Sequence, residues 1–239
     1  MRVLADTHTH TSCSTHAFGT VWENIRAAKE KGLEMICMTD HTPALPDSPH
    51  LWHFITMFEL PDTIDGVRVL KGAEANILDG EGNLDLPMGM QKKMEVLIAS
   101  IHGPCYSQRS VEENTKTWLN VIKNSNVMIL GHSGNPAYPY LHEPVIAAAR
   151  DAGKCVEINN HSFLVRGDCY GNCKNIALTC KKMGTNIVVS SDAHNPFQVG
   201  VFDDAIAILK EIDFPEELIM NLNAERFENY IKNFREGNL

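Results

Sequence analysis

Short apolar runs alternate with helix-length amphipathic segments along almost the whole chain, and this alternation restricts the fold more than any other feature. Seven runs rich in aliphatic residues predict β-strands, at residues 3–6, 34–39, 67–75, 96–101, 127–130, 154–158 and 186–190. Helical periodicity predicts helices at residues 22–31, 111–124, 144–152, 175–183 and 201–209, with terminal helix packing at 216–234. Such alternation is typical of a parallel sheet covered by helices. Seven strands are enough for a closed or nearly closed α/β barrel.

The length of the chain agrees with a barrel. An α/β barrel needs roughly 200–250 residues, and this chain has 239, of which 44% are hydrophobic. No repeat, linker or low-complexity segment divides the sequence, so we predict one domain over residues 1–239. An open, doubly wound sheet is the alternative, but it normally carries a glycine-rich phosphate loop after the first strand. Here that position reads DTHTH, at residues 6–10.

The charge and composition of the chain argue against several functions. The formal net charge is −9, from 21 basic and 30 acidic residues, which argues against binding to nucleic acid phosphates or to anionic membranes. No run approaches the roughly 20 apolar residues of a membrane span, and the first residues lack a signal-peptide pattern. Seven scattered cysteines then indicate a reducing, cytoplasmic setting. Cys169 and Cys173 form one close pair, which we interpret as ordinary thiols rather than a zinc or disulfide motif.

Histidine and carboxylate residues stand at the ends of six of the seven predicted strands. In a parallel barrel these ends open on one face, where active sites form. The nine candidate ligands that this pattern brings to one rim are His8, His10, His16, His41, Glu74, His102, His132, Asp192 and His194. A single histidine at a strand end is more often structural. Many buried histidines together, however, need partners for their ring nitrogens, and a metal cluster supplies them at once.

The number and type of these ligands predict more than one ion. A tetrahedral zinc ion uses four ligands, so nine ligands with a shared carboxylate suit three divalent ions. Zinc, manganese and iron all accept imidazole and carboxylate ligands, and the ligand types do not choose between them. We expect zinc, with manganese or iron as the alternatives. Asp6 and Asp40 adjoin candidate histidines, and we interpret them either as carboxylates that orient an imidazole or as turn residues. The histidines outside the strand-end pattern are those at positions 50, 53, 142 and 161.

The order of these motifs resembles the polymerase and histidinol phosphatase (PHP) domain family. The resemblance rests on DTHTH at residues 6–10, His16, TDH at residues 39–41, Glu74, His102, His132 and SDAH at residues 191–194. It extends over nearly the whole chain and is closest to small stand-alone phosphatases of the YcdX type, through segments such as PHLWHF at residues 49–54 and EINN at residues 157–160. The loop after the sixth predicted strand departs from these relatives, because Arg166 is its only basic residue.

The resemblance implies a distorted (β/α)7 TIM-like barrel with a trinuclear metal site that hydrolyses phosphate esters. The implied ligand sets are His8, His10, Glu74 and Asp192 for one ion, Glu74, His102 and His132 for a second, and His16, His41 and His194 for a third. The expected partner is a small phosphorylated substrate, with no nucleic acid and no membrane. The closest relatives also suggest a homo-oligomer.

Phosphoryl transfer requires mainly positioning and neutralisation of charge on the phosphate oxygens. Clustered divalent ions provide that charge even in an acidic protein. We expect a hydroxide that bridges the ions beside Glu74 to attack phosphorus. Glu74 and Asp192 are the predicted catalytic residues, with Asp192 helping to accept the proton of the water. Arg166 is the predicted phosphate-binding residue, through a forked contact.

Three other functions remain open from the sequence. A metal-dependent amidohydrolase also has His-x-His after its first strand and Asp after its last, but His16, His41 and His194 would be surplus for its two ions. A nuclease-like phosphodiesterase conflicts with the negative charge and the lack of a basic stripe. A non-catalytic metal-binding barrel predicts bound metal without turnover.

Overall fold

The computed structural model describes residues 1–238 and confirms the α/β barrel. Its sheet contains seven parallel strands in the order β1-β2-β4-β5-β6-β7-β8. Their bounds are β1 Ala5–Thr9, β2 Met35–Met38, β4 Val67–Asn76, β5 Val96–Ser100, β6 Ile129–Leu130, β7 Cys155–Asn159 and β8 Ile187–Ser190. Each corresponds to a predicted strand, whereas the short β3 (Thr63–Ile64), antiparallel to β4, was not predicted. The sheet nearly closes, because Thr9 of β1 forms a parallel bridge with Ala193, just beyond β8.

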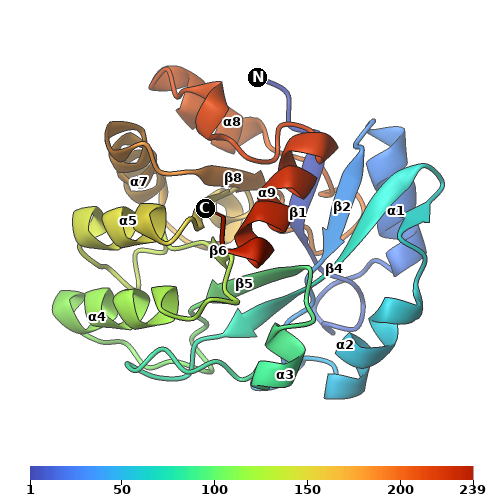
Figure 1. Cartoon of the computed structure of the whole chain (residues 1–239), viewed down its shortest axis with the longest axis horizontal. Coiled ribbons are helices and arrows are strands. Elements are labelled where there is room, and N and C mark those ends of the chain that lie inside the picture. The colour runs from blue at the N-terminus through green and yellow to red at the C-terminus, as the bar shows by residue number, and fades with distance from the viewer. Residues whose placement is uncertain (239) are drawn as a thin grey trace.

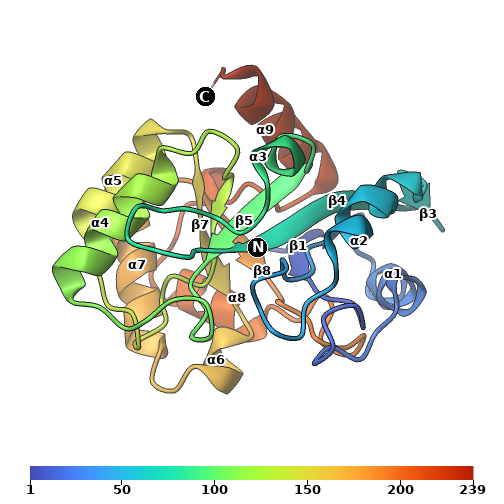
Figure 2. The ribbon, with the colours of Figure 1, turned by 90° about the horizontal axis from the view of Figure 1, so that it is seen from below.

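Helices surround this sheet (Figure 1). The longer ones are α1 Val21–Glu30, α4 Val111–Ile122, α5 His142–Asp151, α7 Tyr170–Met183, α8 Asp203–Glu211 and α9 Ala224–Glu236. The shorter ones are α2 Leu51–Thr56, α3 Met88–Gln91 and α6 Ser162–Val165, with the 3-10 helices η1 Met57–Glu59 and η2 Glu216–Leu218. In Figure 2, α4, α5 and α7 lie on one side of the sheet and α1 and α2 on the other. None of the helices described for residues 1–238 combines the length with the apolar character that a membrane crossing demands.

Local sequence fixes several helix ends. Thr20 and Ser110 each begin a helix through a capping box, in which the hydroxyl accepts a hydrogen bond from a backbone N–H and a glutamate binds back to the cap. Gly184 ends α7 with a φ of 68°, a left-handed conformation that glycine adopts without a steric cost. Most of the longer helices begin and end within about two residues of their predicted bounds, but α7 begins five residues before its predicted start, and the short helices α2, α3 and α6 were not predicted.

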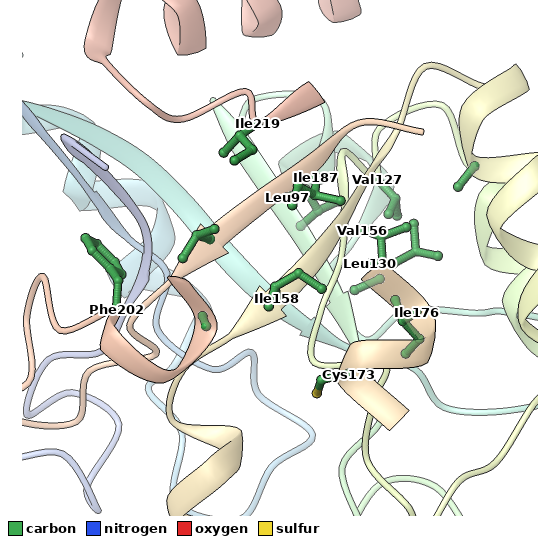
Figure 3. Packing of buried hydrophobic residues seen from close by; sticks show 14 of the residues in the cluster. Leu97, Val127, Leu130, Val156, Ile158, Cys173, Ile176, Ile187, Phe202 and Ile219 are labelled. Carbon is green, nitrogen blue, oxygen red and sulfur yellow. The ribbon is translucent and has the colours of Figure 1, made fainter. Parts of the chain in front are cut away.

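An outer apolar core fills the space between the sheet and its helices. Figure 3 shows Leu130 of β6 and Val156 of β7 close to Ile176 of α7. A second core lies inside the barrel and contains residues from the beginnings of the strands, including Leu70. Phe227, from α9, belongs to this inner core. The helix α9 therefore closes the end of the barrel at which the strands begin.

Inward-facing residues change from apolar to polar along the strands. In β4 they run from Leu70 to Glu74, and in β7 from Cys155 to Glu157, because alternate residues of a strand face the same side. The polar residues all stand toward the carboxyl ends of the strands. The polar end of the barrel interior is therefore the end opposite α9.

Candidate metal centre

The nine predicted ligands converge at the carboxyl ends of the strands. Six of them are buried, His102 and His194 are partly exposed, and His16 is exposed. A cavity of about 690 Å³ opens over them, and the lining includes His16, His41, His102, Asp192 and His194. The structure therefore brings together residues that are up to 186 positions apart in the sequence, from His8 to His194.

Glu74 stands between two groups of histidines. Its Oε2 atom lies 3.3 Å from His8 Nε2 and 3.5 Å from His10 Nε2. Its Oε1 atom lies 2.9 Å from His132 Nε2 and 3.3 Å from His102 Nε2. The carboxylate is completely buried, so each oxygen faces a different set of ring nitrogens. This arrangement is the one that a carboxylate shared by two cations requires.

The first group of ligands contains His8, His10, Glu74 and Asp192. The Nε2 atoms of His8 and His10 are 3.1 Å apart, and Asp192 Oδ1 lies 3.1 Å from His10 Nε2 and 3.6 Å from His8 Nε2. Donor atoms around a tetrahedral zinc ion with bonds of about 2.0–2.1 Å are about 3.4 Å apart. The spacing of this group therefore fits four ligands to one cation.

An irregularity in β1 turns both histidines of this group inward. Ala5 faces the inner core, and strict alternation from Ala5 would turn His8 and His10 to the other face. The register between β1 and β2 shifts between Asp6 and Thr9. A shift of this kind changes the phase of alternation and re-aims side chains.

Two further groups complete the cluster. His102 and His132 approach each other with their Nε2 atoms 3.3 Å apart, beside Glu74 Oε1. His16 and His194 approach each other with their Nε2 atoms 3.0 Å apart. His41 lies between the groups, with its ring centroid 4.2 Å from that of His10 and 5.1 Å from that of His16.

Acceptors behind the rings fix which nitrogen faces the cluster. The Nδ1–H of His8 donates to the carboxylate of Glu157, and that of His16 donates to the carboxylate of Asp47. The Nδ1–H of His102 donates to the side-chain oxygen of Asn76, and that of His194 donates to the backbone carbonyl of Asp192. In a neutral imidazole the other nitrogen, Nε2, then carries a lone pair. Four lone pairs therefore face the cluster, as metal coordination requires.

Several buried polar atoms of the cluster lack a hydrogen-bond partner within the described residues. They are Nδ1 of His10, Nδ1 of His41 and Oε2 of Glu74. His41 Nδ1 and Glu74 Oε2 are 2.8 Å apart, but they are not aligned as a hydrogen bond. Buried polar atoms are normally satisfied, and bound cations would satisfy His41 Nδ1 and Glu74 Oε2. His10 faces the first group through Nε2, so a cation there leaves its Nδ1 atom without a partner. The donor set therefore fits divalent cations.

The electrostatics of the cluster favour the protonation states of metal ligands at four of the candidates, but at His8 and His41 the nearby carboxylates outweigh burial and raise the pKa of the ring. Burial raises the pKa of Glu74 and of Asp192, but the surrounding histidines outweigh burial and hold both pKa values well below the usual range. Burial lowers the pKa of His102 and that of His194, each to about 4. Ionised carboxylates and neutral imidazoles are the forms that bind metal.

The backbone is strained at two of the candidate ligands. His132 has a φ of 24° and Asp192 a φ of 50°, values that residues with a side chain rarely adopt. Strained conformations persist where the surrounding structure imposes them, and they cluster at functional sites. Each residue stands two positions beyond the end of a strand, β6 or β8, where the chain turns and its side chain enters the cluster.

Glu157 is the most connected of the site residues that the sequence analysis missed, which also include Asp47, Asn76 and Asn159. It accepts hydrogen bonds from His8 Nδ1 at 2.7 Å, from the backbone N–H of His132 at 2.5 Å and from the Ser190 hydroxyl at 2.6 Å. It therefore holds two candidate ligands and two neighbouring strands. The sequence did contain a signal for this residue, because Glu157 is the only carboxylate in the buried strand β7.

Asp6 and Asp40 hold backbone segments rather than imidazoles of the cluster. Asp6 accepts hydrogen bonds from the backbone N–H groups of Ser191 and Gly200. Asp40 accepts from the N–H and hydroxyl of Thr11 and from the Ser14 hydroxyl, and it pairs with His53 Nε2 at 3.0 Å. Asp6 therefore fits the interpretation as a turn residue, whereas Asp40 fits both interpretations, because it holds a turn and also orients the imidazole of His53.

The remaining candidates lie in different places. Arg166 lines the cavity and reaches toward Asp192 Oδ2, with Nη1 and Nη2 at 3.4 and 3.5 Å. His161 also lines it, with Nδ1 3.8 Å from the same oxygen. His50 begins α2 as its cap, whereas His142 is the first residue of α5. Cys169 precedes α7 and Cys173 lies within it, and both are buried and form no disulfide.

Comparison with known proteins identifies the family. Residues 6–161 match the sequence model of the PHP domain, a range that contains all the candidate ligands except Asp192 and His194. This chain belongs to the PHP domain family. The resemblance seen in the sequence motifs is therefore confirmed.

Relatives within the family share almost the full length of the chain. A probable phosphatase of Thermoanaerobacter sp. (strain X514) is 47% identical over 234 residues, which cover 97% of this chain and 96% of that protein. A probable phosphatase of Acetivibrio thermocellus is 44% identical over 236 residues, covering 99% and 98%. The fold is similar to that of histidinol phosphate phosphatase from Lactococcus lactis, solved with zinc, L-histidinol and phosphate. The TM-score is 0.63 at 17% identity, over 90% of this chain and 95% of that one.

Proposed function

We propose that this chain is a metal-dependent phosphatase that hydrolyses small phosphomonoesters at a trinuclear centre. Membership of the PHP family and the names of the full-length relatives support phosphoric ester hydrolysis. The observation that carries the proposal is the division of the Glu74 oxygens between two histidine groups, with a third group beside them. A binuclear amidohydrolase would leave that third group without a use.

The proposed ligand sets follow the three groups. His8, His10, Glu74 and Asp192 hold one ion, and Glu74, His102 and His132 hold a second. His16, His41 and His194 hold the third. We propose zinc, because the donors are imidazole and carboxylate and the spacing within the first group suits a tetrahedral ion.

The ions, when bound, supply an activated water molecule and positive charge toward the phosphate oxygens. The residues of this chain position the other components. Glu74 would serve as a ligand to two cations, because its carboxylate is completely buried and each oxygen faces a different group of histidines. The Oδ1 atom of Asp192 is the proposed metal ligand. Its Oδ2 atom accepts a hydrogen bond from Asn159 Nδ2 at 3.0 Å and contacts Arg166, which keeps the guanidinium at the cavity wall. From that position the guanidinium binds a phosphate oxygen.

A substrate screen tests this function. The metal-loaded protein is assayed for phosphate release from a panel of phosphomonoesters, and in parallel for hydrolysis of phosphodiesters, cyclic amides and carboxylic esters. We expect turnover of phosphomonoesters, with loss of activity after chelation and recovery after zinc is added. Turnover confined to amides or carboxylic esters would contradict the proposal, as would bound metal without turnover of any phosphomonoester.

A further inference from the structure

The mouth of the cavity above the ligand cluster is built from apolar side chains. Phe18, Leu45, Pro46, Pro104 and Val165 line it. They come from three loops, which follow β1, β2 and β5, and from the short helix α6, which follows β7. Segments of separate origin therefore each contribute an apolar residue to one rim. Small-molecule sites are typically cavities of about 300–1,000 Å³ with mainly apolar walls, and this cavity, at about 690 Å³, lies within that range.

Phe18 is fixed at this rim although it is not part of the core. Its side chain is 79% exposed, and its backbone N–H donates to the carbonyl oxygen of His194 at 2.7 Å. The loop that carries it also folds back on itself, because Ser12 N–H donates to the carbonyl of Gly19 at 2.7 Å. The aromatic ring therefore belongs to a segment tied directly to a candidate ligand. Together with the other apolar residues that line the cavity, this ring forms an exposed apolar surface of the kind that marks a binding site.

Val165 forms another part of the rim. It is the last residue of α6 and is 57% exposed. Its backbone N–H donates to the carbonyl of His161, which also lines the cavity. Arg166 follows immediately and turns toward Asp192. The short helix thus places a cation toward the ligand cluster and an apolar side chain at the cavity mouth.

Apart from the histidines, the charged groups of the cavity already have partners. Among the described residues that line it, these groups are Asp47, Asp192 and Arg166. Asp47 pairs with the Nδ1–H of His16, and Arg166 with Asp192. If Arg166 binds the phosphate group, no other lysine or arginine lines the described cavity to receive a second anion. A carboxylate or second phosphate on the substrate would be desolvated there without a partner, which is costly.

We propose that the cavity selects phosphomonoesters whose alcohol part is apolar and uncharged, such as an aryl or aralkyl group. This inference rests on the proposed function and specifies its substrate class. The phosphate lies over the ligand cluster, and the alcohol part packs against Phe18, Val165 and the proline-containing loops. Contact of an apolar ligand with these side chains removes their exposed surface from water, which favours binding.

Phosphonates test the selection without a chemical step, because their carbon–phosphorus bond is not hydrolysed by a phosphatase. Isothermal titration of the zinc-loaded protein would compare benzylphosphonate, 2-carboxyethylphosphonate, 2-aminoethylphosphonate and inorganic phosphate. We expect benzylphosphonate to bind at least about tenfold more tightly than either charged phosphonate, a typical effect of one apolar group in a matching pocket. Equal or tighter binding of a charged phosphonate would overturn the inference.

Substitutions at the rim separate its role from that of the ligand cluster. We expect Phe18→Ala and Val165→Ala to weaken benzylphosphonate binding, by about tenfold and about threefold respectively. Binding of inorganic phosphate should change less than about twofold, because phosphate does not reach the rim. Trp52→Ala is the matched control, since Trp52 is 71% exposed on α2 and does not line the cavity. The control should leave both affinities unchanged.

The outcomes distinguish this inference from the function on which it rests. If Phe18→Ala leaves benzylphosphonate binding unchanged while inorganic phosphate still binds, the apolar rim is not a binding surface and only the substrate class is wrong. If neither phosphate nor any phosphonate binds to the zinc-loaded protein, the proposed phosphatase function and the inference are both overturned.

Discussion

The Nε2 atoms of His16 and His194 lie 3.0 Å apart. The other ring nitrogen of each residue already has an acceptor, because the Nδ1–H of His16 donates to Asp47 and that of His194 donates to the backbone carbonyl of Asp192. In neutral rings the two facing nitrogens then both carry lone pairs, which repel at this distance. A divalent cation between them converts this repulsion into coordination. The close approach of these two histidines is therefore better explained by a shared metal ion than by a hydrogen bond between the rings.

Removal of metal should destabilise the fold. Binding to the native state adds about 2.7 kcal/mol per site when the free ligand is at 100 times its Kd. We therefore expect chelation to lower Tm by at least about 5 °C in differential scanning fluorimetry, and added zinc to restore it. The Glu74→Gln variant provides the comparison, because its Tm should respond less to chelation. An identical response in the two proteins would remove Glu74 from the metal site.

Glu74→Gln and His132→Ala should each lower metal content and kcat together. Residues that only orient a metal ligand are worth about 10–100-fold in affinity or activity, so loss of a ligand should cost at least that much. The measurements are elemental analysis and initial rates with a phosphomonoester found by the screen. His142→Ala is the matched control, because His142 begins α5 away from the cluster. Full activity in both ligand variants would contradict the proposed centre.

Glu157→Gln should weaken metal binding while the chain still folds. The carboxylate accepts hydrogen bonds from His8, from the backbone N–H of His132 and from Ser190, through both of its oxygens. Glutamine has only one acceptor oxygen, because its other terminal atom is a nitrogen that donates, so it cannot accept all three hydrogen bonds. We expect about 10–100-fold weaker zinc affinity in competition with a chromogenic chelator. Excess zinc should restore most of kcat, since Glu157 orients a ligand and is not proposed to bind metal. An unchanged zinc affinity would show that Glu157 supports only the packing of β7 and β8.

Arg166→Ala should raise KM more than it lowers kcat. A charge-assisted hydrogen bond to phosphate is worth about 1.5–3 kcal/mol, so we expect KM to rise by at least about tenfold. Arg166→Lys keeps the positive charge but loses the forked geometry, and its KM should lie between those of the parent and the alanine variant. If KM does not change in either variant, Arg166 does not bind the phosphate group of the substrate.

Much of the fold followed from the sequence because its signals are local. Apolar runs and helical periodicity indicate strands and helices without knowledge of tertiary contacts. The convergence of the nine ligands followed from one geometric rule, that parallel strands end on the same face. The short β3 was missed because two residues are too few to produce a periodic pattern.

The details of the site depend on contacts that sequence order does not reveal. The register shift in β1 decides that His8 and His10 face inward, and it arises from the pairing of β1 with β2. Glu157 is visible in the sequence as a lone carboxylate, but its contact with His8 joins residues 149 positions apart. The division of the Glu74 oxygens likewise requires the positions of four separate loops and strands.

The number of tightly bound ions per chain tests the three-ion centre most directly. The protein would be loaded with excess zinc, freed of unbound metal by gel filtration and analysed by inductively coupled plasma mass spectrometry against protein concentration. We predict three ions per chain, and two in the His194→Ala variant, because that substitution removes one ligand of the outermost site alone. Two or fewer ions in the parent protein, or the same number in parent and variant, would contradict the account.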